Sequence, residues 1–265
     1  SPVVTTVTYR ESAGSGRPIV FVHGNSSSSR TWLPLLDGDF GRTYRCVAVD
    51  LPGHGRSPAA TDPGVYSMPG YAAAVAELAG ALGLARAVYV GWSLGGHILL
   101  EAAASLPDPA GIAVFGTPPV ADAAGLAAAF RPNPAVATGF TPDVDAGQAR
   151  AYAASFLAPG SKLPVDAFES DILATDPAAR GGLGASIAAG RFADEVAIAA
   201  ALTVPLAVLH GAEEQLVSLD YLRGLSLPTL WRGEVQVIDG AGHAPHVEQP
   251  EAFTALLTTF VDDAS

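Results

Sequence analysis

The sequence Gly-Trp-Ser-Leu-Gly at residues 91–95 places Ser93 between two glycines. It follows the apolar run 87–90, which is typical of a buried strand, and precedes a run of helical character over 96–104. Small residues on both sides of such a junction permit a tight turn, which can hold a serine in strained backbone geometry with its Oγ exposed. The pattern therefore predicts a serine nucleophile. The same glycines would also suit an ordinary turn with an inert serine.

Two loops further along the chain carry the acid and the base that such a serine requires. The predicted strand 204–209 runs into a loop that contains Glu213 and Glu214, and the predicted strand 234–238 is followed by a Gly-Ala-Gly-His segment that ends at His243. Successive strands of an open parallel sheet deliver their loops to the same edge. The resulting order of serine, acid and histidine is the one expected for a serine in this kind of turn.

These motifs resemble those of the α/β-hydrolase family. Two further segments match, His-Gly-Asn-Ser-Ser-Ser at 23–28 and Asp-Leu-Pro-Gly-His-Gly-Arg-Ser at 50–57, and the resemblance covers nearly the whole chain. Most members carry Asp at the third position after the glycine of the acid loop, where this chain has Glu214. Together with the segments 91–97 and 116–119, this glutamate makes the chain similar to the metal-independent N-acyl-homoserine lactonases, in which Glu serves as the triad acid.

The resemblance implies a role for each residue of a Ser-His-Glu triad. Ser93 would attack a carbonyl carbon, His243 would take its proton, and Glu214 would orient the imidazole and stabilise its charged form. The backbone N–H groups of Leu94 and Asn25 would donate hydrogen bonds to the developing oxyanion. Losing one such donor typically costs about 3–4 kcal/mol of transition-state stabilisation.

Four residues are expected to bind the substrate. The resemblance places Gly24 and Asn25 beside the lactone ring, and it implies that Tyr152 reaches the ring or its amide. Trp92 either forms a wall of the pocket or packs under the turn. Tyr152 would equally suit a core aromatic.

Other titratable residues compete with this assignment. Glu213 is the rival acid, but the family spacing favours Glu214 and leaves Glu213 as a solvated loop carboxylate. His246 forms a His-x-x-His pair with His243, yet zinc needs three or four ligands and no ligand cluster accompanies the pair. No metal or cofactor is therefore expected.

The remaining histidines are interpreted as structural. His97 falls one helical turn after Ser93, so it either lines the floor of the site or packs behind the turn. His23 and His54 lie in glycine-flanked turns, and His210 lies at the end of a predicted strand.

Alternating short apolar strands and helical segments predict an α/β fold, with a mostly parallel sheet covered on both faces. Segments 1–117 and 203–265 are expected to form the α/β-hydrolase core domain. Segment 118–202, whose helical pieces are interrupted by prolines, is expected to form an inserted helical cap, or alternatively an extra layer packed away from the site. Strands are predicted near 3–9, 18–22, 44–49, 87–91, 111–115, 204–209 and 234–238, and helices near 30–37, 69–83, 94–105, 218–224 and 250–262.

A chain of 265 residues, of which 15% are charged, suits one large and compact α/β unit. Its net charge of −12 disfavours nucleic acid and anionic membrane surfaces, since both require a basic face. No run approaches the roughly 20 apolar residues of a membrane helix, and no signal peptide is visible. Cys46 is the single cysteine and is expected to be a small core residue. We expect a cytoplasmic protein, with a monomer as the simplest oligomeric state.

The sequence therefore predicts a serine hydrolase that opens the lactone ring of N-acyl-homoserine lactones and so degrades a quorum signal. Its partner would be a small-molecule acyl lactone or ester. A general carboxylesterase, a carbon–carbon bond hydrolase and a slow-turnover ligand receptor of the same fold are the alternatives. Acyl-chain length, and the choice between an acyl-enzyme and direct attack by water, are left open at this stage.

Overall fold

The computed structural model describes residues 6–264 and contains a seven-stranded sheet with strand order β1-β3-β2-β4-β5-β6-β7. The edge strand β1 is antiparallel to β3, and every other neighbouring pair is parallel. The predicted fold class is therefore confirmed. The strands are β1 (Tyr9–Glu11), β2 (Pro18–Val22), β3 (Arg45–Val49), β4 (Val88–Trp92), β5 (Gly111–Phe115), β6 (Leu206–Gly211) and β7 (Gln236–Ile238).

The central strands are buried on both faces, as a parallel sheet covered by helices requires. Every residue of β4, β5 and β6 is buried, which explains why these strands are continuous apolar runs without a polar alternation. Cys46 lies in β3 and is fully buried, as expected for a small core residue. Burial raises the pKa of its thiol to about 12, so the thiol is neutral at physiological pH.

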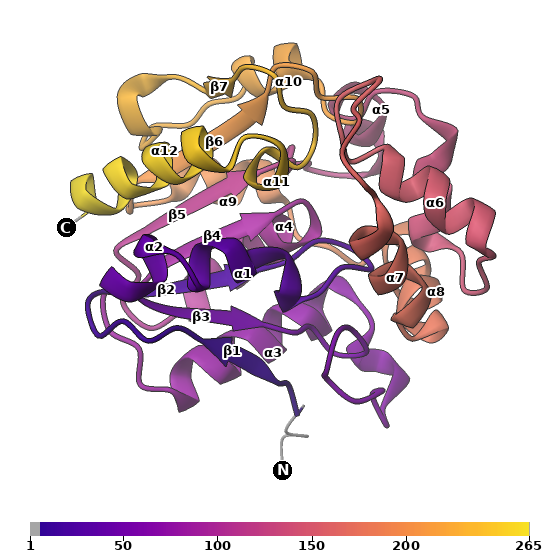
Figure 1. Ribbon diagram of the computed structural model, residues 1–265, viewed down its shortest axis with the longest axis horizontal. Coiled ribbons are helices and arrows are strands. Elements are labelled where there is room, and N and C mark those ends of the chain that lie inside the picture. Colours follow the sequence, from indigo (N-terminus) through magenta and orange to yellow (C-terminus); the bar gives the residue numbers. More distant parts are fainter. Residues whose placement is uncertain (1–5, 265) are drawn as a thin grey trace.

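Two groups of helices cover the two faces of the sheet (Figure 1). In the view of Figure 1, α1, α2, α11 and α12 lie in front of the strands, and α3, α4 and α9 lie behind them. The bounds of these helices are α1 (Leu33–Leu36), α2 (Asp39–Thr43), α3 (Met68–Ala81), α4 (Leu94–Ala102), α9 (Glu195–Ala201), α11 (Pro245–Glu248) and α12 (Pro250–Asp263), with α10 (Leu219–Arg223) following β6.

The segment between β5 and β6 contributes four helices that gather beyond one end of the strands, at the right in Figure 1. Asp145 begins α6 with a capping box that it shares with Gln148, and Asp176 caps α8, whose first residue is a proline. These local signals explain why a proline-rich segment still forms helices. The four are α5 (Leu126–Ala129), α6 (Ala146–Ala154), α7 (Asp166–Ala174) and α8 (Pro177–Ala188).

Several element boundaries differ from those predicted. The helix expected over 30–37 is a 3-10 turn, Ser29–Trp32, followed by the short α1, and α2 was not predicted. The strand expected near 3–9 is observed as Tyr9–Glu11, and residues 1–5 lie outside the described part of the chain. Strand β6 begins two residues later than expected because Pro205 precedes it; proline has no N–H for the ladder. No helix in residues 6–264 combines the length and apolarity needed to cross a membrane.

Arg180 on α8 ties the inserted helices together. Its guanidinium is buried and donates hydrogen bonds of 2.8 Å to the carbonyl oxygens of Thr141, Pro142 and Ile172. A second link joins Asp171 on α7 to the loop after β2, because its carboxylate accepts hydrogen bonds from Ser28 and Arg30. Planar guanidinium groups with five donors suit such multiple carbonyl contacts. The inserted helices are thus fixed both to one another and to the sheet.

Replacing Arg180 should destabilise the protein strongly. Arg180→Leu removes the donors for three carbonyl oxygens and leaves those of Thr141 and Pro142 without partners, while that of Ile172 keeps the N–H of Thr175 at 3.3 Å; the free energy of unfolding should therefore fall by about 3 kcal/mol. Urea denaturation followed by circular dichroism measures this change. Arg191→Leu, at an exposed position near the end of α8, is the matched control and should change the value by no more than about 0.5 kcal/mol. Equal effects of the two substitutions would contradict the role given to Arg180.

Candidate active site

Ser93 has a strained backbone conformation at the junction of β4 and α4. Its φ of 54° and ψ of −117° lie outside the regions that residues other than glycine normally adopt. Two hydrogen bonds hold this conformation: Ser93 N–H donates to the Phe115 carbonyl oxygen at 2.8 Å, and the Thr117 hydroxyl donates to the Ser93 carbonyl oxygen at 2.7 Å. The predicted tight turn is thus present.

The glycines of the motif allow the strand and helix to approach closely. A Cβ atom at Gly95 would lie 2.1 Å from the carbonyl oxygen of Val22, and one at Gly91 would lie 2.5 Å from the backbone of Gly96. Neither contact is sterically possible, and the obstructing atoms belong to the backbone. The two glycines are therefore required by the packing of β2, β4 and α4.

Glu214 and His243 form a buried acid–base pair. Nδ1 of His243 lies 2.8 Å from Oε2 of Glu214, and the side chains are only 3% and 2% exposed. Burial alone would raise the pKa of Glu214, but His243 and the N–H of Leu216 outweigh burial and hold it below its ordinary value. The carboxylate is therefore ionised and accepts the Nδ1 proton. The neighbouring Glu213 is exposed and makes no such contact.

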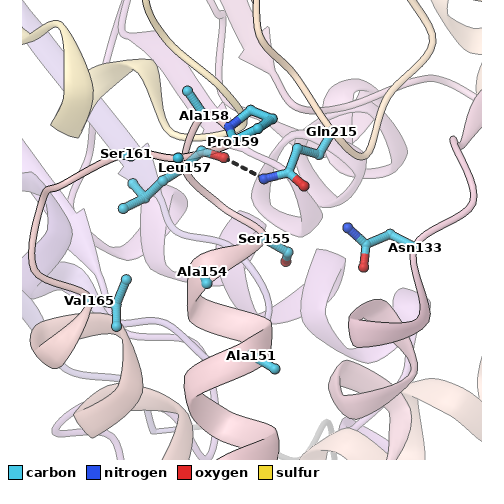
Figure 2. A pocket seen from close by; sticks show the side chains of 11 residues that line it. Asn133, Ala151, Ala154, Ser155, Leu157, Ala158, Pro159, Ser161, Val165 and Gln215 are labelled. Carbon is cyan, nitrogen blue, oxygen red and sulfur yellow. Dashed lines mark hydrogen bonds between the residues drawn. The ribbon is translucent and has the colours of Figure 1, made fainter.

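The acid loop is held in place by the inserted segment. Arg131 donates a hydrogen bond to the Glu214 carbonyl oxygen, and Gln215 Nε2 donates to the Leu157 carbonyl oxygen at 2.8 Å. Figure 2 shows the second contact at the wall of a hollow of about 440 Å³ between α6 and the chain that follows it. No titratable side chain lines this hollow, so it contains no candidate catalytic group. The hydrogen bond from Gln215 at its wall helps to hold the acid loop.

Ser93 and His243 open into a second, larger cavity of about 660 Å³. Gly116, at φ 63°, leaves room for the imidazole, because a Cβ there would lie 2.6 Å from His243 Cε1. Among residues 6–264 no hydrogen bond joins Ser93 Oγ to His243; in this class of site the contact often tightens only with substrate bound. The apolar wall consists of Met68, Leu94, Val120, Leu126, Ala127, Phe130, Pro132, Val136, Phe140, Phe156, Leu183, Ile187, Ala188, Phe192 and Leu216.

The chain with this strained serine and buried acid–histidine pair matches a known family over most of its length. The family model described as the alpha/beta hydrolase family matches residues 19–256. The chain belongs to the alpha/beta hydrolase family.

Relatives of this hydrolase act on carboxylic esters and lactones. A mutant of the N-acyl homoserine lactonase AidH, in complex with N-hexanoyl homoserine lactone, superposes with a TM-score of 0.94 at 37% identity, covering 100% of this chain and 96% of that one. A pimeloyl-acyl-carrier-protein methyl ester esterase from Methylococcus capsulatus is 30% identical over 95% of this chain and 97% of its own. An esterase from Rhodococcus matches with a TM-score of 0.82 at 25% identity, covering 98% and 96%. This hydrolase is an ester or lactone hydrolase.

Of the residues expected at the oxyanion and substrate sites, three line the cavity, whereas Gly24 and Trp92 do not. Asn25, Leu94 and Tyr152 line the cavity, and Asn25 Nδ2 donates to the Gly139 carbonyl oxygen at 2.8 Å. The backbone N–H groups of Leu94 and Asn25 donate to no acceptor within residues 6–264, so both are free to bind a substrate oxygen. Gly24 lies behind the cavity wall, where a Cβ would be 3.3 Å from Ser93 Cβ.

Trp92 does not line the cavity, which corrects its expected contact with substrate. Its indole is 1% exposed and donates from Nε1 to the His243 carbonyl oxygen at 2.9 Å. Phe156 packs edge-on against it. Trp92 thus packs under the turn, which is the other position expected for it. Trp92 therefore positions the histidine loop.

Three of the other histidines have structural hydrogen-bond partners. His246 is buried against Trp92 and its ring contacts Thr31 Oγ1 at 2.8 Å; burial lowers its pKa to about 3. His23 and His54 likewise bond backbone atoms of neighbouring turns. Within the described residues no group of three potential ligands is close enough for a metal ion, and His210 is buried at the end of β6.

Sequence reasoning missed a second buried acid–histidine pair. His97 on α4 and Glu195 on α9 both line the cavity, with His97 Nδ1 2.7 Å from Glu195 Oε1. Glu101 on α4 lies near Glu195, and burial together with the neighbouring negative charge of Glu195 raises the pKa of Glu101 to about 9. Glu101 is therefore neutral at physiological pH. No local signal could pair His97 with a residue 98 positions later.

The proton on Glu101 makes stability depend on pH. The folded protein keeps this proton from about pH 4.5 to about pH 9, whereas the unfolded chain releases it, so stability falls as pH rises through this range. Glu101→Gln cannot ionise. We expect its Tm to exceed that of the wild type at pH 8 by several degrees, and the gap to close near pH 5. A pH-independent gap in scanning calorimetry would contradict the assignment.

Proposed function

We propose that this hydrolase opens the lactone ring of N-acyl-homoserine lactones and thereby removes a quorum signal. The observation that carries the proposal is the buried Glu214–His243 pair near the strained Ser93, with Ser93 and His243 lining a largely apolar cavity. The cavity suits an acyl chain, and its polar end suits a ring with an ester carbonyl. The match to the structure of a lactonase in complex with N-hexanoyl homoserine lactone, at a TM-score of 0.94, supports the same substrate.

The proposed reaction begins with nucleophilic attack. Ser93 Oγ attacks the lactone carbonyl carbon while His243 Nε2 takes the hydroxyl proton, and the ionised Glu214 stabilises the imidazolium through Nδ1. The N–H groups of Leu94 and Asn25 donate to the oxygen that becomes negative. The positive end of α4 points at the same oxygen.

Collapse of the tetrahedral intermediate breaks the ring C–O bond. The departing alkoxide receives the proton from His243, and the acyl group remains on Ser93 as an ester. The new hydroxyl stays tethered to the acyl group, so it competes with water for the ester carbonyl at a high effective concentration. A water activated by His243 then attacks, Ser93 leaves with the proton, and the net change is the addition of one water molecule. We propose that the inserted helices over residues 118–202 serve as the cap that shields this ester.

A carboxylesterase acting on an acyclic ester is the second candidate. The methyl ester esterase that is 30% identical over 95% of the chain favours it. The same triad would serve, but the leaving alcohol would diffuse away. The two candidates therefore differ in whether one product or two are formed.

Mass spectrometry of the reaction product tests the proposal. N-octanoyl homoserine lactone incubated with the protein should gain the mass of one water and give a single product, because the ring oxygen stays attached. Ser93→Ala should lower turnover by several orders of magnitude while it retains the wild-type fold by circular dichroism. Hydrolysis of a methyl or p-nitrophenyl ester with no conversion of the lactone would favour the carboxylesterase instead.

The two neighbouring glutamates give a matched pair of variants. Glu214→Gln should lower kcat/KM by about 10⁴-fold, since the amide can present an N–H to Nδ1 and favour the wrong imidazole tautomer. Glu213→Gln should change it less than about twofold, because an exposed carboxylate is strongly screened. Both are assayed with one lactone at a single pH and salt concentration. Near-normal activity of Glu214→Gln would remove Glu214 from the proposed triad.

A further inference from the structure

The cavity of this hydrolase contains a polar pair that the proposed triad does not use. His97 lies one helical turn after Ser93 on α4, and the side chains of both residues line the cavity. Its Nδ1 is bonded to Glu195 at 2.7 Å, while Nε2 has no hydrogen-bond partner within residues 6–264. The His97 side chain retains 13% exposure, so its ring reaches the cavity space.

The environment of Glu195 decides where the imidazole proton lies. Glu195 accepts hydrogen bonds from the N–H of Val120 at 3.3 Å and from His97 at 2.7 Å. A carboxylate surrounded by donors can only accept, so Nδ1 of His97 carries the proton. In the neutral imidazole the lone pair then lies on Nε2. His97 therefore presents a hydrogen-bond acceptor to the cavity.

This acceptor is placed among apolar side chains. Phe130 lies beside the imidazole, with ring centroids 6.3 Å apart, and Val120 and Phe192 line the same region. A polar atom in such surroundings is unfavourable unless something bonds to it, and a purely alkyl chain cannot. A chain that carries a hydroxyl at the matching depth can.

We propose that His97 is a specificity-determining residue whose Nε2 accepts a hydrogen bond from a hydroxyl group at the 3-position of the acyl chain. Preferred substrates would then be N-(3-hydroxyacyl) homoserine lactones. Glu195 acts as a positioning residue that fixes the tautomer and the ring orientation of His97. This inference rests on the proposed lactonase function.

The length of the substrate fits this placement. Five bonds separate the lactone carbonyl carbon, which Ser93 would attack, from carbon 3 of the acyl chain. Five bonds of an extended chain span about 6 Å, which is also the rise of four helical residues at about 1.5 Å each. Ser93 and His97 are separated by one turn along α4, so one substrate can reach both side chains.

The experiment compares three lactones of equal chain length: N-octanoyl, N-(3-hydroxyoctanoyl) and N-(3-oxooctanoyl) homoserine lactone. For the wild type we expect kcat/KM to be about tenfold higher for the 3-hydroxy compound than for the unsubstituted one, as one hydrogen bond in an apolar site provides. The 3-oxo compound has no donor at that carbon and should gain nothing. In His97→Leu the ratio of 3-hydroxy to unsubstituted should fall to about one, and in His97→Gln, which retains an acceptor, it should be partly restored.

Phe130→Leu is the matched control, because it reshapes the wall beside His97 but leaves Nε2 in place. Its absolute rates can change, and its ratio should remain near the wild-type value. Binding of the lactones to the inactive Ser93→Ala form, measured by calorimetry, should show the same preference for the 3-hydroxy compound. Circular dichroism melts of each variant show whether it is folded.

The outcomes separate this inference from the proposed function. A wild-type protein that hydrolyses all three lactones with equal kcat/KM, or a His97→Leu variant that keeps the preference, overturns the role of His97 and leaves the lactonase proposal standing. A wild-type protein that hydrolyses none of the lactones overturns the proposed function, and the inference with it.

Discussion

The strained backbone at Ser93 is the constraint on which the rest of the site depends. A positive φ at a residue other than glycine is unfavourable and persists only where surrounding contacts determine it. Here these contacts come from three strands: Gly91 in β4, the Val22 carbonyl of β2 opposite Gly95, and the Phe115 carbonyl at the end of β5. The turn is therefore a property of the sheet, and the hydroxyl it presents is as rigid as the sheet itself.

The remaining catalytic groups reach Ser93 because all the loops concerned leave the same edge of the sheet. The acid loop follows β6 and the histidine loop follows β7, and the parallel order of β4, β5, β6 and β7 brings them together. The segment between β5 and β6 stabilises these loops through hydrogen bonds. Arg131 donates a hydrogen bond to the acid loop, and Asn25 donates one to the Gly139 carbonyl oxygen, so the inserted segment is hydrogen-bonded to the loops around Ser93.

The arrangement of the proposed catalytic residues could be predicted from the sequence because each of them belongs to a local pattern after a strand. Ser93, Glu214 and His243 each follow an apolar run that predicts a strand. In a parallel sheet the loops after such strands lie at the same end of the sheet. The side on which Trp92 packs could not be predicted, since it depends on the twist of one turn. The pairing of His97 with Glu195 also lacked a signal, because it arises only when α9 returns beside α4. Short elements such as α2 were missed because five residues carry too little periodicity.

The two edges of the sheet have a consequence for how copies of this protein meet. Within residues 6–264, both edge strands, β1 and β7, are only three residues long. An edge strand has unpaired N–H and C=O groups that can pair with a strand of another molecule, and a short edge strand has few of these groups. Val237 is the one large apolar side chain of β7 that is more than a third exposed. The two edge strands therefore provide few backbone groups for pairing with a second molecule. This limits edge-to-edge aggregation of a protein so rich in buried parallel strands.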